Sequence, residues 1–195
     1  MSAEFLKSCM GQHPDFPKPG VMFCDVLPIL QNPVAFEVSL PDAATTLITD
    51  LLNHVTSVTL PALREKTGNP SAKIDTIVGL DARGFLFGPL IALRLGAAFV
   101  PVRKQGKLPG KCFKAEYEKE YGVDVFEMQE GAIPAGANVV VVDDLIATGG
   151  SAVAAQQLVE QAGAKVVQNL FVVEIEFLKG AEKLSAPTYS IIKAD

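Results

Sequence analysis

The feature that most constrains the fold is a strand, an acidic pair and a glycine-rich turn at residues 139–151. Val139 to Val142 are four consecutive β-branched residues, which predicts a strand buried on both faces, as in a parallel sheet. Asp143 and Asp144 are expected to end this strand, and a helix is expected over residues 152–162. Backbone N–H groups at such a helix start bind phosphate, and the carboxylates can accept hydrogen bonds from sugar hydroxyls. The segment therefore predicts a site for a phosphorylated sugar, the alternative being a core strand with a solvated turn.

Composition restricts the classes of protein that this chain can belong to. With 195 residues, 49% hydrophobic and 20% charged, it is expected to form one globular domain over residues 1–195. The net charge of −5 argues against nucleic-acid binding, and no apolar run is long enough to span a membrane. The start of the chain lacks the apolar region of a signal peptide, so Cys9, Cys24 and Cys112 are expected to be reduced thiols in a cytoplasmic protein. His13 and His54 have no partners at metal-ligand spacing.

The remaining pattern alternates strands with helices. Helices are expected over residues 3–10, 42–55 (with Asp42 as N-cap), 61–66, 85–95, 152–162 and 178–184, and strands over 74–80, 97–103, 116–120, 124–129, 165–174 and 188–192. An extended loop with brief strand character is expected over residues 15–28, and loops are expected over 67–71 and 105–115. Residues 56–71 as a whole are interpreted as a surface elaboration. This order predicts an α/β fold with a doubly wound, mostly parallel sheet. The proline-rich N-terminal part, about residues 1–35, is expected to form a small hood beside the ligand end of the sheet.

Two further segments carry chemistry. GLDARGFLFG at residues 79–88 is a second strand–turn–helix, and the guanidinium of Arg83 suits a pyrophosphate, the alternative being a structural ion pair. The basic residues 103–111 (RKQGKLPGK) predict either a solvated loop or a flexible lid that closes over a polyanionic substrate. Phe23 is either a core residue or a surface on which a flat heterocycle stacks.

The segments DFPKPGVMF, GLDARGFLFGP, RKQGKLPG, EKEYG and VVVVDDLIATGGS together resemble the adenine phosphoribosyltransferase family of type I phosphoribosyltransferases. The resemblance runs from Phe16 to Ile192. It implies a doubly wound core with a hood and a flexible loop, a homodimer, and a place in purine salvage. The implied reaction converts adenine and phosphoribosyl pyrophosphate to AMP and pyrophosphate with Mg²⁺, which is held mainly through the substrate.

The resemblance also implies the roles of individual residues. Those implied in catalysis are Glu120, Arg83 and Tyr121. Those implied to bind the ribose hydroxyls and the 5′-phosphate are Asp143, Asp144, Ala147, Thr148, Gly149, Gly150 and Ser151. Those implied around the pyrophosphate are Asp81, Ala82, Arg83, Arg103, Lys104 and Lys107, with a cis peptide between Asp81 and Ala82. Those implied around adenine are Val21, Phe23, Cys24 and Ile175; Cys24 stands where a long polar residue is expected.

Two alternatives stay open at the level of sequence. One is a phosphoribosyltransferase for another purine base, because the base is recognised largely by backbone groups. The other is a non-catalytic protein that senses phosphoribosyl pyrophosphate. Such a sensor would be expected to lose Arg83, the basic loop or Glu120, and this chain retains all three.

Overall fold

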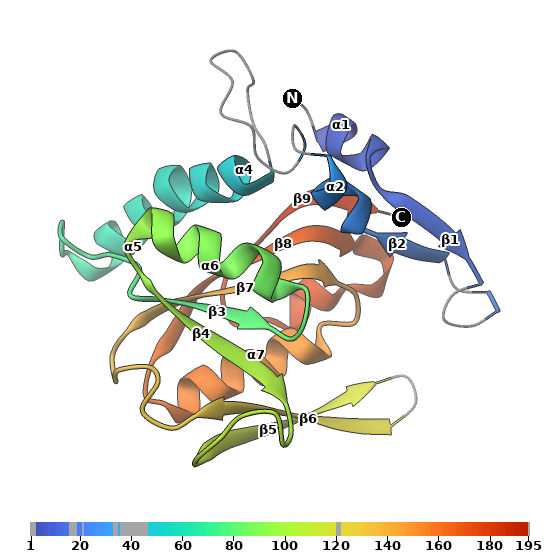
Figure 1. Cartoon of the computed structure of the whole chain (residues 1–195). Coiled ribbons are helices and arrows are strands. Elements are labelled where there is room, and N and C mark those ends of the chain that lie inside the picture. The colour runs from blue at the N-terminus through green and yellow to red at the C-terminus, as the bar shows by residue number, and fades with distance from the viewer. Residues whose placement is uncertain are drawn as a thin grey trace.

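The centre of the molecule is a seven-stranded sheet with the order β5-β6-β4-β3-β7-β8-β9 (Figure 1). This computed structural model describes residues 3–15, 19–20, 22–32, 35, 47–119 and 122–194. The strands are β3 Thr76–Leu80, β4 Ala98–Lys104, β5 Cys112–Lys119, β6 Gly122–Gln129, β7 Asn138–Ile146, β8 Lys165–Ile175 and β9 Thr188–Ala194. Neighbouring strands in the run β4-β3-β7-β8-β9 pair in parallel, whereas β6 pairs antiparallel with both β4 and β5. The mostly parallel sheet predicted from the sequence is therefore confirmed.

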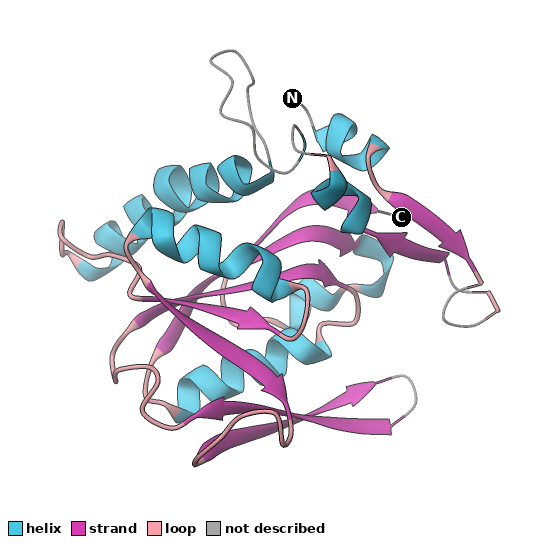
Figure 2. Cartoon of the chain, viewed as in Figure 1, coloured by secondary structure: helices cyan, strands magenta, loops and turns pink. Residues whose placement is uncertain are grey.

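Helices cover both faces of the sheet (Figures 1 and 2). On one face lie α1 Ala3–Ser8, α2 Leu27–Gln31, α4 Leu47–His54, α5 Leu60–Thr67 and α6 Gly84–Leu95, and on the other lies α7 Gly150–Gln161. The valines of β7 alternate between the two cores: Val140 and Val142 pack with Phe87 of α6, and Val139 and Val141 pack with Leu158 of α7. All four valines are fully buried, as the run of β-branched residues predicts.

The hood, defined here as β1 Gly11–Pro14, β2 Met22–Asp25 and α2, lies near the carboxyl ends of β8 and β9 (Figure 1). The two strands pair antiparallel, with Gly11 opposite Asp25 and Pro14 opposite Met22. The brief strand character expected within residues 15–28 is confirmed by β2, whereas the start of α2 at Leu27 was not expected. Strand β1 (GQHP) contains no β-branched residue, so its conformation depends on pairing with β2 rather than on local propensity.

Three other boundaries differ from the sequence-based expectation. Strand β7 continues past the acidic pair to Ile146, because Leu145 and Ile146 pair with Val173 and Glu174 of β8. The loop expected over residues 105–115 ends at Lys111, because Cys112 pairs with Gln129. Residues 176–183 form two short 3₁₀ turns, Glu176–Leu178 and Gly180–Lys183, rather than one α-helix.

The helical segment around residues 47–67 is longer than the sequence indicated. A π-helical turn, Val55–Thr59, joins α4 to α5, and Val55 and Leu63 are buried in the core beneath it. Pro61 has no N–H to donate to the preceding turn, and its ring crowds that turn, which favours the wider π-helical spacing before it. Apart from Thr59, Leu60 and Leu63, residues 56–71 are exposed, so the expected surface position is confirmed for most of this segment, although its first part is helical. The expected start of this helix at Asp42 lies outside the described residues.

The first turn of α6 lies unusually close to β7. A Cβ atom on Gly84 would be 2.5 Å from the backbone oxygen of Val142, and one on Gly88 would be 2.5 Å from the Phe99 ring. A ring can rotate away, whereas the carbonyl is fixed by the sheet. Glycine at residue 84 thus lets α6, and with it Arg83, approach the strand that carries the acidic pair.

Replacing Gly84 by alanine should therefore destabilise the protein more than replacing Gly88 by alanine. Overpacking typically costs about 1–3 kcal/mol, and ~1 kcal/mol lowers the melting temperature of a domain of this size by about 2–4 °C. We expect Gly84→Ala to fall in this range and Gly88→Ala to fall below it. Thermal unfolding followed by circular dichroism measures both, and equal losses would contradict the close approach of backbone to backbone.

Candidate active site

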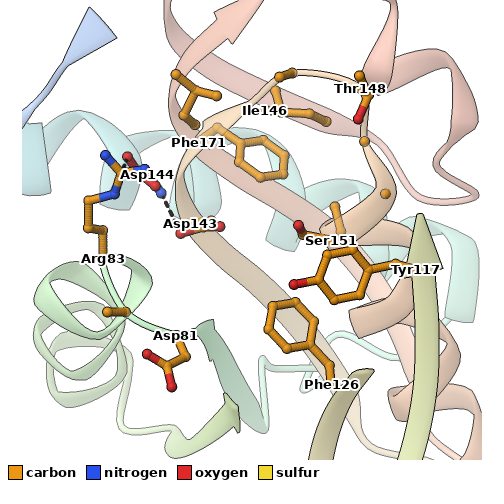
Figure 3. A pocket seen from close by; sticks show the side chains of 16 residues that line it. Asp81, Arg83, Tyr117, Phe126, Asp143, Asp144, Ile146, Thr148, Ser151 and Phe171 are labelled. Carbon is orange, nitrogen blue, oxygen red and sulfur yellow. Dashed lines mark hydrogen bonds and ion pairs between the residues drawn. The ribbon is translucent and has the colours of Figure 1, made fainter. Parts of the chain in front are cut away.

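A cavity of about 260 Å³ lies where β3 and β7 end, side by side in the sheet. The chain leaves β3 through α6 on one face and leaves β7 through α7 on the other, so the connections diverge between these strands. Such a point is where open α/β sheets bind ligands. Among the lining residues are 81–83, which follow β3, and 143–152, which include the end of β7 and the start of α7. The two segments singled out from the sequence thus meet at one cavity (Figure 3).

One wall of the cavity is the turn of residues 147–151, which the sequence predicts to bind phosphate and which is named the phosphate-binding turn for that reason. Gly149 has a φ of 82°, a left-handed conformation that favours glycine, and it is the N-cap of α7. A Cβ on Gly149 would be 2.5 Å from the backbone oxygen of Gly180, so the two glycine backbones pack directly against each other. Lys183 Nζ donates a hydrogen bond to the Thr148 oxygen at 2.8 Å. The turn is therefore held from behind, while its front and the first N–H groups of α7 face the cavity.

The acidic pair forms the floor between this turn and Arg83 (Figure 3). Asp144 is 2% exposed, and its Oδ2 lies 3.0 Å from Nε of Arg83. The contact is an ion pair without good hydrogen-bond alignment, which leaves Oδ2 buried with no hydrogen-bond donor among the described residues. Asp143 Oδ1 accepts a hydrogen bond from the Asp144 backbone N–H at 2.9 Å.

The two carboxyl groups share an unfavourable environment for negative charge. Burial raises the pKa of Asp143 well above its usual range, and the neighbouring charge of Asp144 raises it further. Burial also raises the pKa of Asp144, although the Arg83 guanidinium opposes this shift. Any ligand that donates hydrogen bonds or brings positive charge to this pair would relieve the cost of ionisation.

Arg83 links three parts of the molecule. It follows the Asp81–Ala82 peptide, which is cis as the resemblance implied, and it precedes α6. Besides pairing with Asp144, its guanidinium carbon lies 5.6 Å from the ring centroid of Phe23 in the hood. A second, open cavity of about 580 Å³ lies between them, lined by Phe23, Arg83, His13 and other hood residues. Phe23 thus borders a space next to the 260 Å³ cavity.

The predicted pyrophosphate residues are only partly brought together. Arg103 Nε donates to Asp81 Oδ2 at 3.0 Å, and Arg103 Nη1 donates to the Lys107 oxygen at 3.3 Å. Lys104 Nζ lies 3.7 Å from Asp124 Oδ2 of β6. None of Arg103, Lys104 and Lys107 lines the 260 Å³ cavity, whereas Asp81, Ala82 and Arg83 do.

The base of the lysine-rich loop is fixed by a buried carboxylate that the sequence analysis did not single out. Glu127 is 5% exposed; its Oε2 accepts a hydrogen bond from the Gly106 N–H at 2.8 Å, and its Oε1 lies 3.2 Å from Lys114 Nζ. The bond from Gly106 contributes most to holding the pKa of Glu127 below its usual range. The loop therefore starts from a fixed point on the sheet.

Of the residues expected around adenine, Cys24 and Ile175 do not line either cavity. Cys24 is buried and lines neither cavity, because alternate side chains of β2 point to opposite faces. Ile175 is the last residue of β8, and neither cavity includes it. Val21, Glu120 and Tyr121 lie outside the described residues.

Aromatic side chains that the sequence analysis missed complete the cavity. Tyr117 of β5 and Phe126 of β6 line it, with ring centroids 4.6 Å apart, and Phe171 of β8 lines it as well. Period-two alternation in the 116–129 hairpin was the available signal, but only the tertiary fold turns this hairpin toward the ends of β3 and β7.

Comparisons with known proteins agree with this geometry. Residues 62–193 match the family described as phosphoribosyl transferase domain. Among curated proteins, the chain is 52% identical to adenine phosphoribosyltransferase 1 of Saccharomyces cerevisiae over 98% of this chain and 93% of that protein. It is 51% identical to adenine phosphoribosyltransferase of Yarrowia lipolytica over 96% and 93%.

Solved structures show the same likeness. A structure of the Saccharomyces cerevisiae enzyme complexed with D-2,5-dideoxy-2,5-imino-altritol 1,6-bisphosphate and adenine matches with a TM-score of 0.78 and 51% identity, over 97% of both chains. A structure from Trypanosoma brucei in complex with AMP, pyrophosphate and ribose-5-phosphate matches with a TM-score of 0.74 and 27% identity, over 98% of this chain and 79% of that one.

The raised pKa of Asp143 predicts how its removal changes stability. The folded state binds the Asp143 proton more tightly than the unfolded state does. The contribution of this residue to the free energy of unfolding is therefore most favourable at acidic pH and is lost as the pH rises through the folded-state pKa. Asp143→Asn should therefore raise the melting temperature at pH 7 by about 2 °C or more, with the gain disappearing near pH 4. Thermal unfolding between pH 4 and 8 measures this, with the exposed Glu116→Gln as the control. A gain that is constant with pH would show that charge is not its cause.

Proposed function

The chain belongs to the adenine phosphoribosyltransferase family of type I phosphoribosyltransferases, and we propose that the cavity between β3 and β7 is its active site. The protein transfers the phosphoribosyl group from phosphoribosyl pyrophosphate to adenine, which yields AMP and pyrophosphate in purine salvage. The observation that carries the assignment of the site is the meeting of the phosphate-binding turn, the acidic pair and Arg83 on one cavity.

Within this site, the phosphate-binding turn holds the 5′-phosphate of the substrate. Its N–H groups and those of the first turn of α7 supply donors, and the positive end of the helix dipole favours the anion. Asp143 and Asp144 accept hydrogen bonds from the two ribose hydroxyls. The raised pKa values of both carboxyl groups support this role. Their ionised forms lack stabilisation in the free protein, and hydrogen bonds donated by a sugar would supply it.

The pyrophosphate binds on the opposite side of the ribose, near Asp81, Ala82 and Arg83. The Arg83 guanidinium, which lies beside Asp144, is within reach of this position and can bind two phosphate oxygens at once. Arg103, Lys104 and Lys107 approach when the loop of residues 105–111 closes over the substrate. Two glycines with positive φ, Gly106 and Gly110, allow this loop to change conformation.

The donor set fits a Mg²⁺ ion held mainly by the substrate. The carboxylates of Asp143 and Asp144 line the cavity at the proposed sugar position. Mg²⁺ prefers oxygen ligands and keeps several of its ligands as water or phosphate oxygens. When bound, it neutralises charge on the departing pyrophosphate, while Asp143 and Asp144 orient the hydroxyls.

Adenine stacks on Phe23, with Ile175 and the backbone of Val21 around it. The buried position of Cys24 supports contact with the base through the backbone alone. As the bond from C1 of the ribose to pyrophosphate breaks, positive charge develops at C1, and N9 of adenine attacks from the opposite face. Glu120, with Tyr121 beside it in sequence, accepts the N9 proton.

The oligomeric state and the cellular location that we propose are those implied by the family resemblance. We propose a homodimer that buries the outer surface of α6, where Leu86 and Leu93 are 40% and 78% exposed. We also propose a cytoplasmic location, supported by three cysteines that form no disulfide. No helix in the described parts of the chain is long and apolar enough to cross a membrane.

Base choice tests the proposed function directly. Adenine should be converted to AMP with a kcat/KM at least about 10³-fold higher than hypoxanthine is converted to its nucleotide. The 6-amino group donates a hydrogen bond where the 6-oxo group accepts one, so buried partners are left unpaired with the wrong base. Product formation from phosphoribosyl pyrophosphate, Mg²⁺ and each purine base measures this. Comparable values for two bases would favour the broader purine specificity, and no product with any base would favour the sensor.

The role of Glu120 is tested against its neighbour Glu116, which is exposed on the same hairpin. Glu120→Gln should lower kcat by about 10²-fold or more and change the KM for adenine little, as expected for general acid–base catalysis. Glu116→Gln should leave kcat within about twofold of the unchanged protein. Steady-state kinetics of both variants, with thermal unfolding as a check on folding, decides between them. Similar small losses would make Glu120 an ordinary residue of a charged hairpin.

A further inference from the structure

A third cavity, of about 290 Å³, lies at the opposite end of the sheet from the active site. Part of it is formed by residues 165–168 at the start of β8 and by residues 185–188, which lead into β9. The rest is formed by the helical segment from His54 to Lys66. Phe171 of the same strand lines the active site, which places the two cavities about 10–20 Å apart along β8. This third cavity is therefore separate from the proposed active site.

His54 lines this cavity, and its ring is held in place by a neighbouring residue. The imidazole of His54 stacks on the ring of Tyr189, with centroids 3.9 Å apart and planes 9° from parallel. The Tyr189 hydroxyl donates a short hydrogen bond to Asp50, which fixes the ring from below. Burial lowers the pKa of His54, so the imidazole is neutral at neutral pH. A flat, uncharged ring held in one orientation is suited to contact with another flat ring.

The floor of the cavity contains a polar group without a partner. Thr188 Oγ1 is buried and has no hydrogen-bond partner among the described residues. Leaving such a hydroxyl unpaired is costly, so a rotation of the Thr188 side chain that brings it to a polar atom of a ligand in the cavity would be favourable. Its neighbours are already engaged: Thr59 Oγ1 donates to Gln168 Oε1 at 3.2 Å, and Gln168 Nε2 donates to the Asn169 oxygen at 3.1 Å. Thr59 also ends the π-helical turn, a distortion that is frequent at functional sites.

The charge at the cavity is of one sign. Lys66 and Lys165 both line it, and no Asp or Glu is among the lining residues. Neither ammonium group forms an ion pair within the part of the chain that the structure describes. The remaining lining is largely apolar, including Val58, Ala62 and Leu63. The cavity thus combines apolar walls, one unpaired hydroxyl and two positive charges.

We propose that this cavity is a second binding site, for a small anionic molecule that carries one flat ring, such as an aromatic carboxylate. The volume is at the lower limit for small-molecule sites, which restricts the ligand to about one ring and its substituents. The ring lies against the His54 imidazole and the apolar walls, a polar atom of the ligand pairs with Thr188 Oγ1, and the anionic group faces Lys66 and Lys165. This inference does not depend on the reaction carried out at the first site.

Benzoate and its uncharged analogue benzamide are suitable probes, titrated into the full-length protein with and without saturating AMP. We expect amide chemical shifts in NMR spectra to change at Thr59, Gln168 and Thr188 and not at Thr148. Benzoate should bind at least threefold more tightly than benzamide, and AMP should not compete. Displacement of benzoate by AMP, shifts centred on the phosphate-binding turn, or no binding at about 10 mM would overturn the proposal.

Variants test the charge and the hydroxyl separately. The double variant Lys66→Gln with Lys165→Gln should weaken benzoate at least fivefold and benzamide less than twofold, while AMP formation stays unchanged. Lys73→Gln, an exposed lysine before β3, is the matched control and should change neither affinity. Thr188→Val, which keeps the shape and removes the hydroxyl, should weaken both probes. Equal affinity of benzoate for the double variant and the control would refute the site.

Discussion

The contact between Arg83 and the buried Asp144 carboxylate is the interaction on which the site depends. It joins the turn after β3 to strand β7, and the same guanidinium extends to Phe23 of the hood. Without this cation, two adjacent carboxylates deep in the molecule would have no compensating charge, and removing one partner of a buried pair is strongly destabilising. Because the ion pair lacks good hydrogen-bond alignment, Asp144 keeps an oxygen that a substrate can still use.

The phosphate-binding turn has its shape fixed before a ligand arrives. Gly149 packs against the Gly180 backbone, and Lys183 binds the Thr148 oxygen. On the next turn of α7, Gln156 Oε1 accepts hydrogen bonds from both N and Oγ of Ser185. These contacts tie the segment after β8 to the turn from behind, so binding phosphate does not require the turn to be ordered first.

This preorganisation has a cost in stability. Burial raises the pKa values of both Asp143 and Asp144, which means that the folded protein is destabilised at neutral pH by the charges that the proposed site uses. Natural active sites commonly retain such unfavourable groups because function requires them. The rest of the fold offsets the cost through two hydrophobic cores, one on each face of the sheet, that meet along the valines of β7.

The pattern of residues along the chain is enough to predict the alternating strands and helices, and therefore the parallel sheet and the edge where we propose that its ligand binds. It also placed Asp143, Asp144, Arg83 and residues 147–151 together, because local strand–turn–helix patterns fix where strand ends meet. Features that depend on pairing between distant segments could not be predicted from local patterns. Strand β1 forms because β2 lies beside it, and β7 continues past its acids because β8 extends alongside. In the same way, Cys24 turns into the core and Tyr117 onto the cavity, since the side on which a strand residue lies is set by its neighbours and not by its own identity.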